Sequence, residues 1–521
     1  MHTPHDGATK WWIGNAATDG RAATVFAQLT IGEDEYGVHA FIVPLRDASG
    51  VALPGVTIKD CGMKAGLNGV DNGALQFNRV RIPRDNLLDR FGTVAPDGTY
   101  SSHIASPTKR FAVTLGALTG GRVGLSVGSA AVSQLAVTIA VRYASVRRQF
   151  GQLPEKPRLG QKPVKKADEP QEELILDYPP HQRKLMPLLA NCYAHQFATD
   201  FLVQRYVAMK AEGDEPSDEA LAEVHTLSSG LKPMVTWATH EAIDVCREAC
   251  GGHGYSAINR LGELREDHDV WKTFEGDNTV LLQQLAGDLL KGYAKQVGST
   301  VLEQGLFMMK RLIGLDGSTE VSAQASNLRD PSFQLAAFEM REDRLLHETA
   351  MHLQADIKRL PAFSAFRKNM NAVLDLARAH VERRVLQQFI AKVQEIEITD
   401  METAVRLKRL CDLYAIHRIA ASPESFNSAR ASVLLRGEVD ALCAELREDA
   451  LALVAAFDIP DHVIRAPIGL AEPDMSAYLR AVGFGDDSQG RKRIEKNLTT
   501  AAESVAEPKG SVVKVLSAQS N

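Results

Sequence analysis

The stretch Thr-Phe-Glu-Gly-Asp-Asn-Thr at residues 273–279, preceded by Cys-Gly-Gly-His-Gly-Tyr at residues 250–255, is the most informative part of this 521-residue chain. A glycine-rich turn and a lone carboxylate, Glu275, stand just ahead of an apolar run that predicts a helix. Glutamate is common in the first turn of a helix, because the helix dipole favours an anion there. A second interpretation is a general base, since Phe274 and the apolar residues 280–282 would exclude water from the carboxylate and strengthen it as a base.

The glycines in these stretches favour the second interpretation. Gly276 permits an unusual backbone angle directly after Glu275. The Gly-Gly-His-Gly turn at residues 251–254 offers bare backbone that could approach a large, flat ligand. By itself this turn is a weak signal, because no predicted strand precedes it and it does not match the Gly-x-Gly-x-x-Gly pattern of dinucleotide-binding proteins.

The composition is that of an ordinary globular protein. Hydrophobic residues make up 45% of the chain and charged residues 24%. The length predicts roughly two to four domains. The formal net charge of −6 is small for this length, and it argues against binding to nucleic acids or anionic membranes. Ala and Leu abound beyond the first hundred residues, so most of the chain is expected to be helical.

Cysteine usage and the chain ends predict a compartment. Six cysteines are scattered without a Cys-x-x-Cys pair, which favours free thiols in a reducing compartment over a metal site. The apolar run at residues 111–140 is interrupted by Arg122 and several serines, so we expect a buried helix rather than a membrane span. No signal peptide is evident, and residues 519–521 are not the peroxisomal Ser-Lys-Leu address. These features predict a cytoplasmic protein.

Residues 1–98 predict an antiparallel β domain that begins abruptly. Strand-like runs at residues 10–14, 23–30 and 38–44 are separated by turn-forming residues, and residues 74–82 alternate with period two. From residue 107 the pattern becomes helical. Residues 107–150 predict one long helix, or two helices broken near Gly120 and Gly121.

The helical part is expected to form two domains, at residues 107–314 and 325–485, followed by a polar tail at 486–521. Residues 154–173 contain four prolines and ten charged residues, a composition that predicts an exposed, mobile loop. Asp330 followed by proline predicts the start of a helix. Further helices are expected at residues 371–395, 401–420 and 434–457. The predicted fold class is multidomain and mainly α, with a partial antiparallel β domain followed by two α-helical bundle domains.

Taken with their order along the chain, several motifs resemble the acyl-CoA oxidases, which are relatives of the acyl-CoA dehydrogenases. The resemblance rests first on residues 249–255 and 273–280. Other segments match in the same order: Lys-Trp-Trp-Ile-Gly at 10–14, Tyr-Gly-Val-His-Ala-Phe-Ile-Val-Pro at 36–44, Asn-Gly-Val-Asp-Asn-Gly at 68–73, Val-Arg-Ile-Pro-Arg at 80–84, Arg-Arg-Gln-Phe-Gly at 147–151, Asp-Tyr at 177–178 and His-Gln-Arg at 181–183. The match is dense up to about residue 295 and more diffuse beyond.

This resemblance implies a flavoenzyme. It implies FAD as cofactor and α,β-dehydrogenation of a fatty acyl-CoA to a trans-2-enoyl-CoA, with O2 reduced to hydrogen peroxide. The family's base, which removes the α-proton, falls on Glu275. The enolate oxygen that develops needs preorganised donors. The resemblance assigns these to a flavin hydroxyl and the backbone N–H of Glu275.

The resemblance also implies cofactor and substrate contacts. Gly14 falls on the family's flavin-contacting glycine, although a strand-end bulge is an alternative. Arg147 and Phe150 resemble the element that reaches the FAD phosphates across the interface of a homodimer; the alternative for the arginine is a surface salt bridge. Gly251 and Gly252 would lie near the same cofactor. Arg122 is expected in the substrate pocket or, alternatively, in a structural ion pair.

The sequence departs from the family pattern at its beginning. The family opens with a helical domain and a first stretch of β domain that precede the matching residues. Three interpretations remain: an acyl-CoA oxidase, an acyl-CoA dehydrogenase that passes electrons to a carrier protein, and a non-catalytic remnant or subunit. The predicted helical domain beyond about residue 315 favours the oxidase, because the dehydrogenases typically end soon after the helix that follows the base. Glu248, where the dehydrogenases carry glutamine, slightly favours it too.

Overall fold

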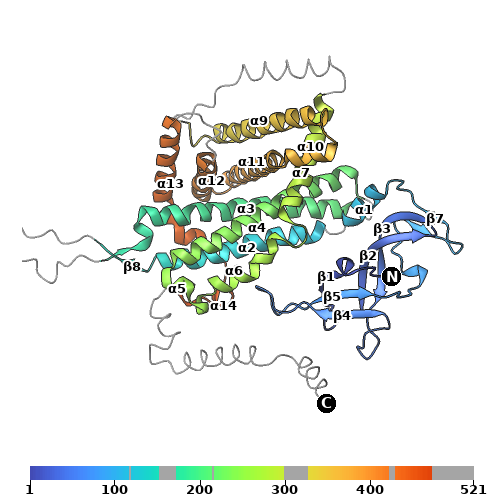
Figure 1. Cartoon of the computed structure of the whole chain (residues 1–521). Helices are drawn as coiled ribbons and strands as arrows, with labels where there is room; N and C mark the ends of the chain where they lie inside the picture. Colours follow the sequence, from blue (N-terminus) through green and yellow to red (C-terminus); the bar gives the residue numbers. More distant parts are fainter. Residues whose placement is uncertain (117–118, 152–171, 214–215, 298–326, 422–428, 472–521) are drawn as a thin grey trace, which may run out of the picture. The chain divides into compact units, whose positions relative to one another are not determined.

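The structure is a computed structural model that describes residues 1–116, 119–151, 172–213, 216–297, 327–421 and 429–471 (Figure 1). Short antiparallel strands occupy its N-terminal part, and long helices make up most of the remainder. This confirms the predicted fold class, mainly α with a small antiparallel β region. Of the loop predicted at residues 154–173, residues 154–171 lie outside the described residues, as does the polar tail predicted at residues 486–521.

The N-terminal strands pair only in the antiparallel sense within the described residues. The strands are β1 (Lys10–Gly14), β2 (Ala22–Ile31), β3 (Asp34–Pro44), β4 (Val56–Asp60), β5 (Asn72–Phe77), β6 (Thr93–Val94) and β7 (Tyr100–Ser101). One sheet has the order β1-β5-β4, and β2 and β3 form a long hairpin. Their apolar core contains Val25, Val43, Leu75 and Phe77.

The strand predicted at residues 74–82 ends earlier than the alternating pattern suggests. Strand β5 stops at Phe77, and Arg79 has a φ of 51°, a left-handed conformation that no regular strand contains. The prediction extended too far because alternation of side chains continues through a turn that breaks the backbone. The strands expected at 10–14, 23–30 and 38–44 are present as β1, β2 and β3.

The middle of the chain is a set of long helices. They are α1 (Pro107–Leu115), α2 (Thr119–Ala144), α3 (Pro179–Ala211), α4 (Asp218–Ala249), α5 (Gly251–Tyr255), α6 (Leu261–Asp269) and α7 (Asn278–Val297). The segment predicted as one or two helices at 107–150 is therefore two. The second helix ends at Ala144 rather than near residue 150. Beyond it, β8 (Arg148–Gln149) pairs with β9 (Glu173–Leu174).

Helix α2 is the one described helix long and apolar enough to cross a membrane. Its most apolar window has a mean hydropathy of 1.6, but 67% of that window is buried inside the protein. A helix that is apolar on all sides and covered by other parts of its own chain is typical of a protein core. This agrees with the expectation of a buried helix.

The C-terminal helices pack in sequence order. They are α9 (Pro331–Ile357), α10 (Ala362–Lys368), α11 (Met370–Glu397), α12 (Met401–Ala421), α13 (Ala429–Ala455) and α14 (Asp461–Ile464). Helix α11 contacts both α9 and α12, and α12 contacts α13. The predicted start of α9 is confirmed: the side chain of Asp330 accepts a hydrogen bond from the Ser332 N–H, with proline in the first turn.

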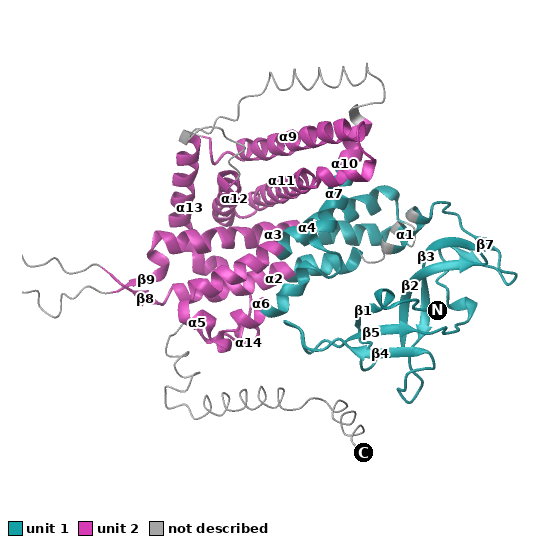
Figure 2. Ribbon diagram, viewed as in Figure 1, with its two compact units in different colours: residues 1–128, 199–236, 266–289 teal, residues 129–198, 237–265, 290–521 magenta. Residues whose placement is uncertain are grey.

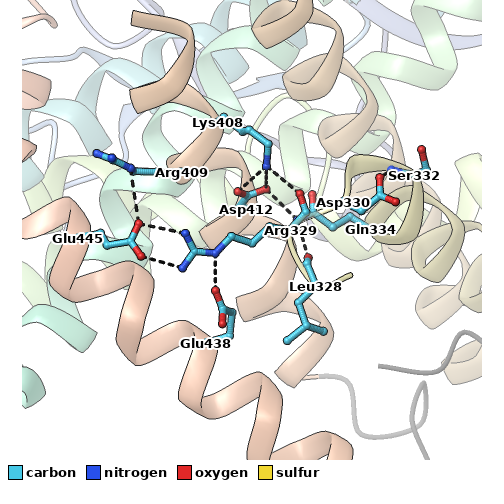
Figure 3. Close-up of polar contacts among 10 residues, drawn as sticks. All are labelled: Leu328, Arg329, Asp330, Ser332, Gln334, Lys408, Arg409, Asp412, Glu438 and Glu445. Carbon is cyan, nitrogen blue, oxygen red and sulfur yellow. Dashed lines mark hydrogen bonds and ion pairs between the residues drawn. The ribbon is translucent and has the colours of Figure 1, made fainter. Parts of the chain in front are cut away.

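An ion-pair network ties these helices together (Figure 3). Arg329, just before α9, donates hydrogen bonds to Glu438 and Glu445 on α13. On α12, Lys408 Nζ lies 2.8 Å from a carboxylate oxygen of the buried Asp412, which also accepts a hydrogen bond from Gln334 on α9. Each cation here is matched by a carboxylate, so the network is a structural one.

The chain divides into two compact units (Figure 2). Unit 1 comprises residues 1–128, 199–236 and 266–289, and unit 2 comprises residues 129–198, 237–265 and 290–521. Both units are discontinuous in sequence. The consecutive domain boundaries expected at about residues 98–107 and 314–325 remain a prediction.

Candidate active site

Glu275 lies in a turn that enters α7 and belongs to unit 1. Its φ is 55°, and that of Gly276 is 105°. A non-glycine residue in the left-handed region is uncommon and costs of order 1–3 kcal/mol. Such strain persists only where the surroundings hold it, and it is concentrated at functional sites.

Glu275 is not a residue of the first helical turn. Helix α7 begins at Asn278, three positions later. The carboxylate that satisfies the free N–H groups at the start of α7 is Asp277, whose Oδ1 accepts from Thr279 N at 2.9 Å and Val280 N at 3.3 Å. The interpretation of Glu275 as an ordinary helix-start glutamate is therefore wrong.

Arg122 holds the backbone of Glu275. It is buried on α2, and its Nε donates to the Glu275 carbonyl oxygen at 3.1 Å. Burial lowers the pKa of Arg122, and the negative charge of Glu275 opposes that effect. Within the described residues no ion pair of Arg122 is found. Its contact with a substrate stays a prediction.

Lys232 holds the next peptide of the turn, and the sequence analysis missed it. This lysine of α4 is fully buried, and its Nζ donates to the Gly276 carbonyl and to Asn278 Oδ1, both at 2.8 Å. Burial lowers the pKa of Lys232 to about 8; the positive charge of Arg122 acts in the same direction, while Asp277 and Glu275 oppose it. The available signal was a single charged residue within the otherwise uncharged helical segment at residues 226–239.

Gly121 makes room for the carboxylate of Glu275. A Cβ atom built on Gly121 would lie 2.6 Å from both Cδ and Oε2 of Glu275. The carboxylate therefore rests directly against the backbone of α2, one residue before Arg122. A side chain at position 121 would displace it, because the end of a glutamate side chain moves more easily than a helix backbone does.

The expected apolar enclosure of Glu275 is not found among the described residues. The side chain of Glu275 is exposed. Two aromatic residues precede it in the sequence, Trp271 and Phe274, and the centroids of their rings lie 6.3 Å from each other. Phe274 itself is 38% exposed. The reason is the orientation of the turn: its two carbonyls are directed to the buried cations Arg122 and Lys232, which leaves its side chains on the accessible side.

The segment at residues 251–254, predicted as a glycine-rich turn, forms most of the short helix α5 in unit 2, and its three glycines differ in their surroundings. A Cβ on Gly254 would lie 2.1 Å from the Arg247 carbonyl oxygen, so packing alone requires that glycine. Gly251 has a φ of 55°, a conformation that glycine adopts without strain. Gly252 has neither constraint, and nothing lies within 4 Å of its would-be Cβ. Nothing lies within 4 Å of a Cβ built on Gly251 either, so both glycines leave open space.

Arg147 and Phe150 lie beyond the end of α2, also in unit 2. Arg147 donates to Gln149 Oε1 at 2.8 Å. The pKa of His253, in the glycine-rich turn, is lowered by burial and further by the positive charge of Arg147, so the two residues are close. Phe150 is 75% exposed and has a φ of 59°. The surface salt bridge considered for Arg147 is not found within the described residues.

Gly14 ends the edge strand β1 in unit 1. Nothing lies within 4 Å of a Cβ built there. An irregularity of the strand register is present, but it lies between Lys10 and Ile13 and therefore before Gly14. Neither packing nor the bulge requires glycine at this position.

Among the described residues no cluster of three or more His, Cys, Asp or Glu side chains could hold a metal ion. The chemistry available around Glu275 is that of a carboxylate held by two buried cations through its backbone. The described cysteines do not change this picture, because all six are free thiols and five are buried.

Comparisons with known proteins match nearly the whole chain. The family model described as acyl-CoA oxidase, C-alpha1 domain, matches residues 115–290, and the one described as acyl-CoA oxidase matches residues 330–473. A relative from Arabidopsis thaliana, acyl-coenzyme A oxidase 2, peroxisomal, is 47% identical over 504 residues, which are 93% of this chain and 70% of the relative. The chain belongs to the acyl-CoA oxidase family.

Other acyl-CoA oxidases agree with this assignment. Peroxisomal acyl-coenzyme A oxidase 3 of Homo sapiens is 38% identical, over 91% of this chain and 68% of the relative. The solved structure of Arabidopsis thaliana acyl-CoA oxidase 1 matches with a TM-score of 0.78 at 30% identity, over 94% of this chain and 73% of that chain. The match of the C-terminal helices to an acyl-CoA oxidase model supports the oxidase interpretation over the dehydrogenase.

The predicted cytoplasmic location is wrong. Relatives in Arabidopsis thaliana and Homo sapiens are named as peroxisomal acyl-CoA oxidases, which points to the peroxisome. The prediction relied on the absence of a signal peptide and of the Ser-Lys-Leu address, and the absence of these two signals does not determine a compartment.

Proposed function

We propose that this acyl-CoA oxidase uses FAD to convert a fatty acyl-CoA to its trans-2-enoyl-CoA in the peroxisome, with O2 reduced to hydrogen peroxide, and that Glu275 is its base. The observation that carries the proposal is the turn at Glu275. Its carboxylate rests over the bare backbone of Gly121, in a strained conformation that two buried cations hold. A residue with only a helix-capping role would not need this arrangement, since Asp277 already caps α7.

The residues present fit FAD. Solved acyl-CoA oxidase structures from Caenorhabditis elegans are described as complexes with FAD. In this chain Gly14 and Gly252 leave space that no neighbouring atom fills, as close approach to a flat ring requires. Arg147 offers a guanidinium fork suited to a pyrophosphate. When bound, FAD supplies the acceptor for the hydride that leaves the β-carbon of the acyl chain and passes the electrons to O2.

Glu275 performs the proton transfer in this scheme. Its carboxylate takes the proton from the α-carbon of the acyl thioester, and the electron pair that is left forms the double bond as hydride leaves the β-carbon. The negative charge that builds up on the thioester oxygen is stabilised by a hydrogen-bond donor at that atom. The backbone N–H of Glu275 is available for this role, because within the described residues it donates to no protein acceptor.

Arg122 and Arg147 take no part in the proton transfer, and Arg122 is expected to line the substrate pocket. Arg122 keeps the Glu275 carbonyl fixed, and in doing so it orients the peptide that follows. Four residues would contact bound FAD from the second subunit of a homodimer, as the family resemblance implies: Arg147, Phe150, Gly251 and Gly252. Sedimentation of the FAD-loaded protein tests this arrangement: a monomer that binds FAD with full affinity would contradict it.

The experiment that tests the function uses the purified chain loaded with FAD. Acyl-CoA is expected to bleach the visible flavin absorbance under anaerobic conditions, and hydrogen peroxide should form once air is admitted. Bleaching without peroxide, together with fast reduction of an artificial electron acceptor, would favour a dehydrogenase. A colourless protein that FAD does not reconstitute would favour a non-catalytic remnant.

A further inference from the structure

Lys232 is an unusual residue for the interior of a helix bundle. Its side chain has 0% exposure, and its neighbours along α4, Leu231 and Val235, are also buried. Lysine is almost never fully buried unless it is paired, because removing an ammonium group from water is costly. A compensating set of interactions must therefore hold it there.

The partners of Lys232 all belong to the turn that carries Glu275. Its Nζ donates to the Gly276 carbonyl and to the side-chain oxygen of Asn278, whose amide group in turn donates to Thr236 on α4 at 3.0 Å. Neither direct partner is a carboxylate. The charged groups that face Lys232 are Asp277 and Glu275 from the turn and Arg122 from α2.

Two buried cations thus hold two consecutive carbonyls of one turn. Arg122 binds the carbonyl of residue 275, and Lys232 binds that of residue 276. These two carbonyls belong to the peptide planes on either side of Gly276, the residue in the turn with the greatest backbone freedom. Fixing both planes removes that freedom, so the left-handed conformation of Glu275 can persist.

We propose that Lys232 is a positioning residue for Glu275: by holding the Gly276 carbonyl and the Asn278 side chain, it fixes the turn that keeps the Glu275 carboxylate over Gly121. This proposal rests on the proposed role of Glu275 as the base. Lys232 touches no reacting atom and acts through the turn alone.

The charge of Lys232 gives the proposal a signature in pH. An ammonium group donates stronger hydrogen bonds than a neutral amine does. Because the pKa of Lys232 is lowered to about 8, its hold on the turn should weaken as the pH rises through that value. Arg122 stays charged over this range and continues to hold the Glu275 carbonyl. The turn should therefore loosen in part.

The test compares the FAD-loaded wild-type chain with Lys232→Met, which keeps the length of the side chain and removes its donors. The rate of flavin reduction at saturating acyl-CoA should fall by about 100-fold, since a small displacement of a catalytic group has effects of that size. FAD affinity should stay unchanged. The rate of flavin reduction by the wild type should fall above about pH 8, and Lys232→Met should show no such fall.

Lys408→Met is the matched control. Lys408, on α12, also donates hydrogen bonds to a backbone carbonyl and to a side chain.

Hydrogen exchange provides a readout that does not depend on activity or on the folding of a variant. In the wild-type chain, exchange of the amides at residues 273–277, corrected for its intrinsic pH dependence, should accelerate as the pH rises through about 8. Lys232→Met should exchange fast in this segment at every pH. If the wild type does not reduce flavin at all, the proposed function fails. Hydrogen exchange at residues 273–277 then still tests whether Lys232 fixes the turn. Wild-type exchange and a wild-type rate in Lys232→Met would overturn the proposal.

Discussion

The cations next to Glu275 and those in the C-terminal helices form hydrogen bonds with different kinds of partner. Next to Glu275, the hydrogen bonds of Arg122 and Lys232 end on backbone carbonyls and an amide oxygen, which carry no net charge. In the C-terminal helices, Arg329 and Lys408 bond carboxylates (Figure 3).

The difference is visible in the proton affinities of the two sets. Burial lowers the pKa of Lys232, because no carboxylate is bonded to it. The pKa of Arg329 is raised, chiefly by its hydrogen bond to Glu445. Arg329 and Lys408, which are matched by carboxylates, connect helices, whereas Arg122 and Lys232, which hydrogen-bond only to neutral groups, place positive charge near the carboxylate of Glu275. This contrast separates a structural network from a candidate catalytic one, and the variants below test it.

Among the variants that test this contrast, Gly121→Ala is expected to have the largest effect, and that effect is on catalysis. The new methyl group would lie 2.6 Å from the Glu275 carboxylate and displace it. The rate of flavin reduction by acyl-CoA should fall by about 100-fold. The free energy of unfolding should not decrease, because alanine is the better helix former.

Gly124→Ala is the matched control for Gly121→Ala. It lies one helical turn further along α2, and nothing lies within 4 Å of its would-be Cβ. Both variants gain the same helix propensity, so only the displacement of Glu275 distinguishes them. Equal rates in the two variants would contradict the placement of the base over Gly121.

The next effect is on stability, from Lys408→Met in the C-terminal helices. This change leaves the buried carboxylate of Asp412 with Gln334 as its remaining side-chain partner. The free energy of unfolding in urea should fall by about 2 kcal/mol, the cost of leaving a buried charged group poorly satisfied. Flavin reduction per folded molecule should not change. A slower rate in this variant would remove the distinction between the two regions.

The smallest effect concerns pH. Burial would raise the pKa of Glu342, but hydrogen bonds from His380 and Arg383 outweigh it and hold the pKa at about 2. Between pH 4.5, its ordinary value, and about 2, the unfolded chain binds the additional proton. The stability contributed by Glu342 is therefore present above pH 4.5 and is lost as the pH falls through that range.

Glu342→Gln should flatten this acid dependence in urea unfolding curves recorded at a series of pH values. The rest of the acid dependence should remain, since other carboxylates of the chain still titrate. A variant with the same acid dependence as the wild type would show that Glu342 does not contribute in this way.

Much of the fold could be predicted from the sequence, because helix periodicity and capping are local. The start of α9 at Pro331 and the positions of α11 and α12 were expected, and the structure confirms them. The end of β5 was misplaced because an alternating pattern does not reveal that Arg79 turns the backbone. Helix positions, which depend on residues close in sequence, were thus predicted correctly, whereas the backbone turn that ends β5 was not.

Less of the site could be predicted. The sequence around Glu275 drew attention to that residue, and the family resemblance drew attention to Arg122, but the roles of Lys232 and Gly121 depend on contacts between residues distant in sequence. Lys232 is 44 residues from Gly276 in sequence, and Arg122 is 153 residues from Glu275. No local spacing encodes such contacts. The exposure of Glu275 was also unexpected, since the direction of its turn is set by the two cations it meets.

The most direct test of Glu275 as the base is the anaerobic reduction of flavin by acyl-CoA in Glu275→Gln. The amide has nearly the shape of the carboxylate and cannot accept the proton, so the variant should bind FAD as the wild type does and reduce it at least about 1000-fold more slowly. Reduction at the wild-type rate would show that another group removes the proton, and it would contradict the central claim.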